Sequence, residues 1–322
     1  MKDFEDDFNE ENIKKDIRKA KFKLILKVIS ISISIIVLLI GSIVNLIICA
    51  KYSRKSYANN DIRVQLSIPS GYISKSDDIF GFFGGNGTYK ISKDIGGKPI
   101  VLEECVSRFG LLPFFNCYRG CGGGYHNSGE WPVSFWENGY KKMRFFHPEL
   151  EYKEYQNDLK KIDGISDDKI IEMGISFDRP YKIMEMYLPE SQLRDVKVTW
   201  LWLDEFTENK MNEFQNEINK YDDKANGIME NEVLGIGFHD YFMIDKNSYN
   251  YSYDELINTL SKSNDTKYKE LYEEIMKKGK TSADDAKILG VIVQGKKEDL
   301  INLRGKSFIK ASSFGVITDK IY

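Results

Sequence analysis

One uninterrupted apolar run constrains this chain more than any other feature. Residues 28–50 contain no charged side chain. A helix over this range rises about 34 Å, enough to cross a hydrocarbon core of about 30 Å. Ile and Ser alternate over residues 29–34 as in a strand, but a lone strand in lipid leaves its backbone unpaired. We therefore predict one transmembrane helix over residues 28–50.

Basic side chains are more frequent before this run than after it. Those that precede it are Lys14, Lys15, Arg18, Lys19, Lys21, Lys23 and Lys27. Those that follow it are Lys51, Arg54, Lys55 and Arg63. The positive-inside rule predicts a cytoplasmic segment over residues 1–27 and an extracellular C-terminal part. The alternative is a cleaved signal peptide, but the run is long for one and no small-x-small cleavage site ends it.

Two candidate partner surfaces lie in and before the span. On a helical wheel, small and polar residues form one narrow stripe, which consists of Ser30, Ser34, Gly41 and Asn45. This stripe suits contact with a second membrane regulator, although single spans also tolerate such residues. In the cytoplasmic segment, the candidate contacts for a soluble partner are Phe4, Phe8, Lys14, Lys15 and Arg18. The alternative is a polar tail whose basic residues meet the headgroups of the lipid bilayer.

Residues 51–164 are predicted to form a β-rich external region. Ile62, Val64, Leu66 and Ile68 alternate with polar residues, which indicates a half-buried strand. We expect a turn at Gly84–Gly87. Further strands are predicted over residues 88–91, 99–103 and 142–146.

Residues 165–322 are predicted to form an α+β domain. Strand, helix and strand patterns follow one another over residues 171–177, 181–187 and 196–203, and again over 288–293, 298–303 and 308–318. Two such β-α-β units suggest a ferredoxin-like split β-α-β sheet. Residues 205–286 form an insertion between the units. Its apolar residues recur at helical spacing, so we expect a helical insertion with core-facing stripes.

The sequence contains no motif that anchors an enzymatic function. No His-Glu-x-x-His, Gly-x-Ser-x-Gly or Walker motif occurs, so we assign no catalytic residue, metal, cofactor or small-molecule substrate. The net charge of −3 comes from 46 basic and 49 acidic residues. This balance gives no general attraction to nucleic acid, and we predict no such partner.

Three of the four cysteines lie in the external region. Cys117 and Cys121 are the first candidates for a disulfide, and Cys105 with Cys117 is another pairing. Unpaired thiols are a further alternative. Cys105, Cys117, Cys121 and His126 also contain the donors of a Cys₃His zinc site, but the sequence lacks the Cys-x-x-Cys spacing typical of one.

The aromatic residues of the external region have two interpretations. Trp131, Trp136 and Tyr140 follow a glycine-rich stretch and are candidates to stack on a glycan or peptide ligand. The alternative is that they belong to the core of the β-rich region.

The order of these segments is similar to a known regulatory family. A Lys-rich lead-in, one span, Thr88–Ile91 and Phe145–Pro148 resemble the N-terminal part of membrane-bound sigma-factor regulators of Gram-positive bacteria. Gly174–Tyr181, Val198–Asp204, Ile288–Val293 and Ala311–Asp319 resemble their C-terminal regulator domain.

This resemblance implies an anti-sigma factor. Such a protein holds an extracytoplasmic-function sigma factor with its cytoplasmic segment and responds to envelope conditions with its outer domain. The cytoplasmic segment here is shorter than is usual for the family. The alternative is therefore an envelope-binding receptor module that lacks direct sigma-factor binding and acts with a second membrane partner.

Overall fold

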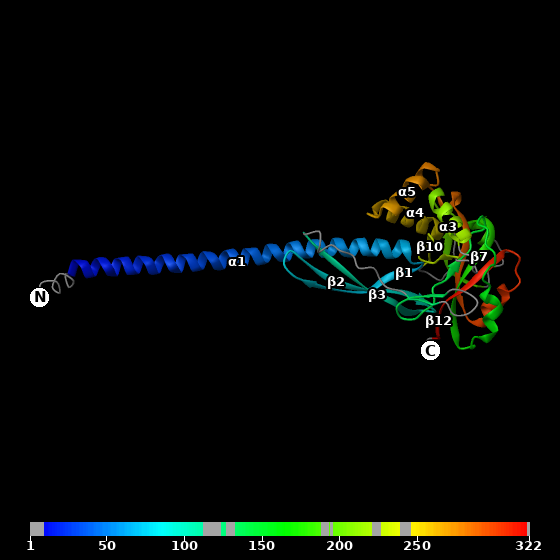
Figure 1. The fold of residues 1–322 in the computed structure, drawn as a ribbon, viewed down its shortest axis with the longest axis horizontal. Helices are drawn as coiled ribbons and strands as arrows, with labels where there is room; N and C mark the ends of the chain where they lie inside the picture. Colours follow the sequence, from blue (N-terminus) through cyan, green and yellow to red (C-terminus); the bar gives the residue numbers. More distant parts are fainter. Residues whose placement is uncertain are drawn as a thin grey trace.

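A computed structural model describes residues 10–111, 124–126, 133–187, 193, 196–220, 227–238 and 246–320. Figure 1 shows one long helix, α1 (Glu10–Ser67), that leads into a body of two larger sheets and a group of helices. The 58 residues of α1 give it a length of about 87 Å.

The apolar run lies inside α1, and the predicted helix over residues 28–50 is confirmed. Among the described residues, one helix is long and apolar enough to cross a membrane, with a mean hydropathy of 2.8 over its most apolar stretch. Only 6% of that stretch is buried, whereas the core helix of a soluble protein is mostly buried. The length, composition and exposure of α1 are consistent with a membrane anchor.

The predicted strand at residues 62–68 is wrong, because α1 continues to Ser67. Val64 and Ile68 pack into a core formed with the β-rich region. Ile62 and Leu66 pack against the core of the C-terminal sheet. Successive residues of a helix are about 100° apart, so positions separated by two face nearly opposite directions. A helix buried on two opposite faces thus produces the alternation that is typical of a strand.

Three antiparallel strands follow α1 and lie along it (Figure 1). They are β1 (Gly71–Phe80), β2 (Gly84–Ile95) and β3 (Lys98–Gly110). The segment of α1 from residue 45 to its end rises about 33 Å, and β1 extends by about the same length in the opposite direction. The end of β1 therefore returns to the level of Asn45.

The turn predicted at Gly84–Gly87 lies earlier in the chain. These residues begin β2, and the reversal occurs between Phe80 and Gly84. A side chain at Gly84 or Gly85 would collide with the backbone of Phe109 or Ile79. The glycines therefore serve close approach between strands rather than the reversal itself.

The C-terminal region contains a five-stranded sheet in the order β10-β8-β11-β7-β12, in which all neighbouring strands are antiparallel. Its strands are β7 (Lys169–Lys182), β8 (Lys197–Leu203), β10 (Gly235–Gly237), β11 (Lys287–Gly295) and β12 (Ile309–Asp319). The four strands predicted here are confirmed. The helix predicted from Tyr181 begins two residues later, because β7 continues to Lys182 before α2 (Ile183–Tyr187).

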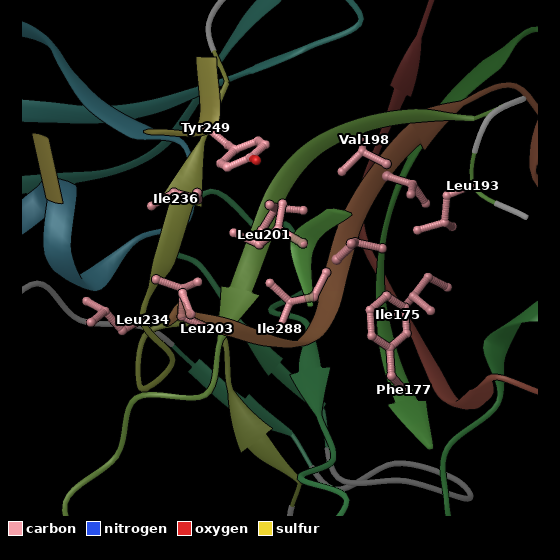
Figure 2. Packing of buried hydrophobic residues seen from close by; sticks show 14 of the residues in the cluster. Ile175, Phe177, Leu193, Val198, Leu201, Leu203, Leu234, Ile236, Tyr249 and Ile288 are labelled. Carbon is pink, nitrogen blue, oxygen red and sulfur yellow. The ribbon is translucent and has the colours of Figure 1, made fainter. Parts of the chain in front are cut away.

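Helices cover one face of this sheet. They are α2, α4 (Lys246–Lys262), α5 (Thr266–Lys277) and α6 (Lys297–Leu300). Figure 2 shows the core under them, which contains Ile175, Leu201 and Ile288 from three strands and Tyr249 of α4. Short 3-10 helices complete this layer and its edges, namely η2 (Asp158–Gly164), η3 (Ala283–Asp285) and η4 (Ile301–Leu303).

The opposite face of the sheet packs on an aromatic core. Trp200 and Trp202 of β8 meet Phe145 and Phe146 there, together with Phe214. The elements that carry this layer are β6 (Arg144–Phe145), α3 (Glu208–Lys220) and β9 (Ile228–Met229), and β6 pairs with β9. Two further short strands, β4 (Gly124–His126) and β5 (Val133–Phe135), pair with each other. Within its described residues, the insertion contributes the helices α3, α4 and α5, as predicted, and the short strands β9 and β10.

The packing of α1 predicts that its last turns stabilise the β-rich region and the C-terminal sheet that follow it. Leu66→Ala should lower the free energy of unfolding by about 2–5 kcal/mol, because it leaves a cavity in the core under the sheet. Gln65→Ala, which changes the exposed neighbour, should cost less than about 0.5 kcal/mol. Denaturant unfolding of the full chain in detergent measures both. Equal losses for the two variants would contradict the observed burial.

Candidate functional site

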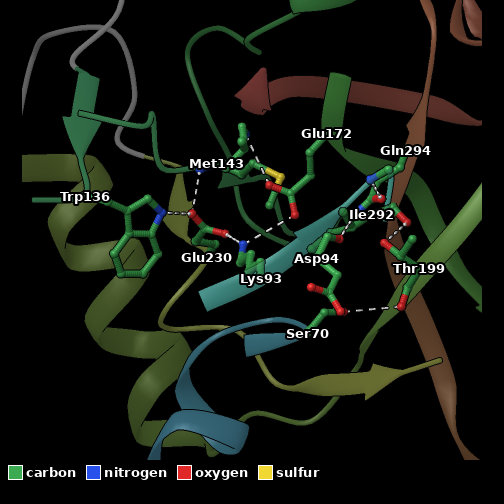
Figure 3. Close-up of polar contacts among 12 residues, drawn as sticks. Ser70, Lys93, Asp94, Trp136, Met143, Glu172, Thr199, Glu230, Ile292 and Gln294 are labelled. Atoms are coloured by element: carbon green, nitrogen blue, oxygen red, sulfur yellow. Dashed lines mark hydrogen bonds and ion pairs between the residues drawn. The ribbon is translucent and has the colours of Figure 1, made fainter. Parts of the chain in front are cut away.

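A buried charge cluster lies where the β-rich region meets the C-terminal sheet. It consists of Lys93, Glu172 and Glu230, whose side chains are at most 2% exposed. The Lys93 ammonium contacts both carboxylates, with Nζ 3.4 Å from Oε1 of Glu172 and a short hydrogen bond to Oε2 of Glu230. Figure 3 shows the ammonium between the two acids.

Neutral donors satisfy the remaining carboxylate oxygens. Oε1 of Glu230 accepts the indole N–H of Trp136 at 3.0 Å and the backbone N–H of Met143 at 3.3 Å. Oε2 of Glu172 accepts the backbone N–H of Val316 at 3.2 Å. Each carboxylate thus has one oxygen on the ammonium and one on neutral donors (Figure 3). Such complete pairing is what buried charges require.

The charges of the cluster do not cancel when all three groups are ionised. Burial raises the pKa of Glu172, and the attraction of Lys93 only partly offsets this increase. Burial acts to lower the pKa of Lys93, but the two carboxylates more than offset it and hold this pKa above its usual range. The cluster therefore keeps its ammonium charged and favours uptake of a proton by Glu172.

Each member of the cluster comes from a different part of the fold. Lys93 is on β2, Glu172 is on β7, and Glu230 lies in the turn after β9. A second contact lies beside it, where the side-chain amide of Gln294 on β11 donates to the carbonyl of Asp94 at 2.9 Å and accepts the N–H of Gly96 at 3.1 Å. The β-rich region is therefore fastened to the sheet by polar contacts as well as by apolar packing.

The geometry suits mechanical coupling better than catalysis. The cluster contains no serine, cysteine or histidine nucleophile, and its carboxylate oxygens are paired with Lys93 or with the neutral donors Trp136, Met143 and Val316. Among the described residues, no group of three or more His, Cys, Asp or Glu side chains is placed to hold a metal ion. What the arrangement provides is a buried polar contact that joins the β-rich region to the C-terminal sheet.

The sequence patterns do not predict this cluster. Its members are far apart in the chain and belong to no motif. One signal was available, since Glu172 interrupts the apolar side chains of β7, and the strand is buried from Ile171 to Phe177. A charged residue inside a buried strand needs a partner, but the sequence does not indicate which one.

Trp136 is part of the core and not a free stacking surface. Its side chain is 2% exposed, and its indole N–H donates to Glu230. Tyr140 is partly buried against the same core. Both observations favour the core interpretation over the predicted ligand-binding role. Trp131 lies outside the described residues.

The cysteines divide into one thiol and one disulfide among the described residues. Cys49 is a buried free thiol on α1, whereas Cys105 on β3 is disulfide-bonded. Cys117 and Cys121 lie outside the described residues. The predicted Cys117–Cys121 disulfide therefore stays a prediction, and an oxidised Cys105 does not suit the zinc alternative.

Three of the five predicted partner residues of the cytoplasmic segment lie on the described part of the chain. Lys14, Lys15 and Arg18 are exposed near the start of the helix, and their binding role stays a prediction. Phe4 and Phe8 lie outside the described residues.

The stripe in the span is already partly engaged within the chain. The Ser34 hydroxyl donates to the carbonyl of Ser30 at 2.9 Å, and Gly41 has open space around it. Asn45 hydrogen-bonds to residues at the turn between β1 and β2. A partner helix therefore remains a prediction for Ser30, Ser34 and Gly41, whereas Asn45 has an intrachain role.

Two family models of known proteins match the sequence of this chain. The model described as "Sigma factor regulator N-terminal" matches residues 14–100, which include α1 from Lys14 onward, β1, β2 and Lys93. The model described as "Sigma factor regulator C-terminal" matches residues 162–316, which include Glu172 and Glu230. No curated protein and no solved structure matches the chain.

The pairing in the charge cluster predicts a large effect of removing its cation. Lys93→Met should destabilise the full chain by about 3–5 kcal/mol, because two buried carboxylates then face each other without compensation. Lys90→Met is the matched control on the same strand. Its ion pair with Glu104 is exposed, so the loss should be about 1 kcal/mol or less. Denaturant unfolding compares the two, and adding Glu172→Gln and Glu230→Gln to Lys93→Met should recover part of the loss. Equal losses of unfolding free energy in Lys93→Met and Lys90→Met would contradict the importance of the buried ion pairs.

The raised pKa of Glu172 predicts a pH dependence that Glu172→Gln removes. The folded chain keeps the Glu172 proton to higher pH than the unfolded chain does. Between the two pKa values the folded state binds more protons, so this group's contribution to stability falls as pH rises through that window. The stability of the wild type relative to Glu172→Gln should therefore decrease from acidic to neutral pH. Thermal unfolding across this range measures the difference, and an increase with pH contradicts the assignment.

Proposed function

Given that this chain belongs to the sigma factor regulator family, a regulatory family whose members are of the anti-sigma-factor type, we propose that it controls an extracytoplasmic-function sigma factor. In this proposal α1 crosses the membrane once with its N-terminus in the cytoplasm. The β-rich region and the C-terminal sheet lie outside the cell and respond to envelope conditions.

The continuity of α1 is the observation that carries this proposal. One helix contains the exposed basic residues at its start, the apolar run, and the turns buried between two cores at its end. A movement of the outer part therefore moves the whole helix, since no loop lies between them. The basic bias before the apolar run supports the proposed orientation.

The exposed start of α1 is the proposed contact for the sigma factor, through Lys14, Lys15 and Arg18. A second membrane regulator would instead use Ser30, Ser34 and Gly41. In the C-terminal domain we propose a ferredoxin-like split β-α-β arrangement. The strand order β8-β11-β7-β12, with all neighbours antiparallel, supports it, as do the short helices after β7 and β11.

Transcription from promoters of the controlled sigma factor tests the function. Deletion of the gene should raise this transcription, and the wild-type chain should restore repression. A chain with Lys14→Gln, Lys15→Gln and Arg18→Gln should restore it poorly, because the contact for the sigma factor is weakened. A chain with Lys51→Gln, Arg54→Gln and Lys55→Gln is the matched control, since it changes exposed basic residues at the other end of the apolar run.

Tags at the two ends separate a failure of orientation from a failure of binding. Protease added to intact cells should remove a tag after Tyr322 and leave a tag before Met1 intact, in the wild type and in both variants. No rise in transcription on deletion would contradict the anti-sigma role and favour the receptor alternative. A protected C-terminal tag would contradict the orientation.

A further inference from the structure

The turn between β1 and β2 is bound to α1 inside its apolar run. We call residues 79–84 the hairpin tip. The side-chain amide of Asn45 donates to the carbonyl of Gly81 at 3.0 Å and accepts the N–H of Phe83 at 2.6 Å. One helical turn later, the Cys49 thiol donates to the carbonyl of Gly84 at 3.4 Å. The tip is thus held beside the C-terminal end of the apolar run.

The side chains of the tip are apolar and exposed. Ile79 is 76% exposed, Phe80 is 42% exposed and Phe82 is 77% exposed. Leu46 and Ile47, beside Asn45 on α1, are also exposed. A cluster of large apolar side chains open to solvent is unusual on a soluble surface. Here it is continuous with the exposed apolar surface of α1.

Because the tip is bound to Asn45, it lies beside the predicted span rather than beyond the end of the span. Asn45 precedes Ala50, the last residue of the apolar run, by about 7.5 Å along the helix. Protein segments that lie in a membrane interface are buried by about 5–10 Å. If α1 crosses the bilayer with this run, the tip lies at that depth in one leaflet.

On α1 and on the hairpin, the charged residues nearest to the apolar segments lie at about the same height along the helix axis. Lys51 is the first charged residue of α1 after the apolar run, and Asp78 is the last charged residue of β1 before the tip. The Ser53 hydroxyl donates to the Asp78 carboxylate, so these two positions lie side by side. Residues 79–89 then carry no charge. Both elements change from charged to apolar at one plane, as the boundary of a hydrocarbon layer requires.

The backbone of the tip is paired to an extent that suits a nonpolar environment. Besides the bonds to Asn45 and Cys49, the N–H of Gly81 donates to the carbonyl of Gly84 at 2.7 Å, and the N–H of Leu111 donates to the carbonyl of Phe83 at 3.0 Å. Irregular backbone is tolerated at membrane depth only where its polar groups find partners within the protein. Asn45 likewise gains the partners that a polar side chain in a span needs.

We propose that the hairpin tip inserts into the lipid bilayer beside α1, with Phe82 and Ile79 in the acyl-chain region next to the headgroups. The inference rests on the proposed membrane span of α1 and adds a second insertion point to it. The β-rich region is then held against the leaflet surface by lipid contacts as well as by the helix. Whichever side of the membrane the two sheets occupy, the tip enters the leaflet that faces them.

Tryptophan fluorescence of the full chain in lipid nanodiscs tests the proposal. Three variants each place a reporter at an exposed site, namely Leu38→Trp in the middle of the span, Phe82→Trp in the tip and Ser76→Trp on β1. Ser76 is the matched control, because it lies on the hairpin about 10 Å before Ile79 and on the charged side of Asp78. The lipids carry a nitroxide quencher either near the headgroup end or near the methyl end of the acyl chain. The signal of the wild type, with its four tryptophans, is subtracted.

We expect Phe82→Trp to lose most of its fluorescence with the quencher near the headgroup, and Leu38→Trp to lose most with the quencher near the methyl end. Ser76→Trp should keep its fluorescence with both. If Phe82→Trp behaves as Ser76→Trp does while Leu38→Trp is quenched, the tip is outside the lipid and the inference fails, although the span stands. If Leu38→Trp is not quenched, the span itself is wrong and the inference falls with it. Ile79→Trp repeats the measurement should Phe82→Trp misfold.

Discussion

The burial of the last turns of α1 on two opposite faces is the constraint on which the other contacts depend. Val64 and Ile68 belong to one core and Leu66 to another. A helix with one buried face can roll on its support, but a helix held between two cores cannot, because rolling would expose one set of side chains to water. Each buried aliphatic side chain contributes about 1.5–3 kcal/mol. The direction of α1 is therefore set by the β-rich region and the C-terminal sheet.

The buried charge cluster acts on the same joint in a different way. A buried ion pair seldom adds net stability over apolar packing of the same size, but a broken one is costly. The cluster of Lys93, Glu172 and Glu230 therefore adds little net stability to the observed arrangement. Separating β2 from β7 would, however, cost much free energy, because it would leave buried charges unpaired. Apolar packing between α1 and the two cores supplies most of the stability of this joint. The charge cluster restricts how β2 and β7 can be placed relative to each other.

Much of the architecture was predictable because strong periodic signals determine it. The apolar run, the four strands β7, β8, β11 and β12, and the helices of the insertion follow from local patterns. Residues 62–68 have the pattern of a strand although they belong to α1 and the residue after it, because burial of a helix on two opposite faces produces the same alternation. The role of Asn45 and the charge cluster were not predictable, since each depends on contacts between residues distant in sequence. A single sequence identifies a buried charge but not its partner.

These constraints determine what kind of movement can pass along the chain. An internal opening between the β-rich region and the sheet would separate Lys93 from Glu172 and expose apolar surface around Val64 and Val316, which pack in the same core. A tilt of the outer part as one body breaks neither contact. In the proposed membrane arrangement, such a tilt moves the hairpin tip relative to the leaflet and carries α1 with it, because Asn45 joins the two. In that arrangement a signal would reach the start of α1 as a rigid-body movement against the bilayer, rather than as a change inside the part of the chain that follows α1.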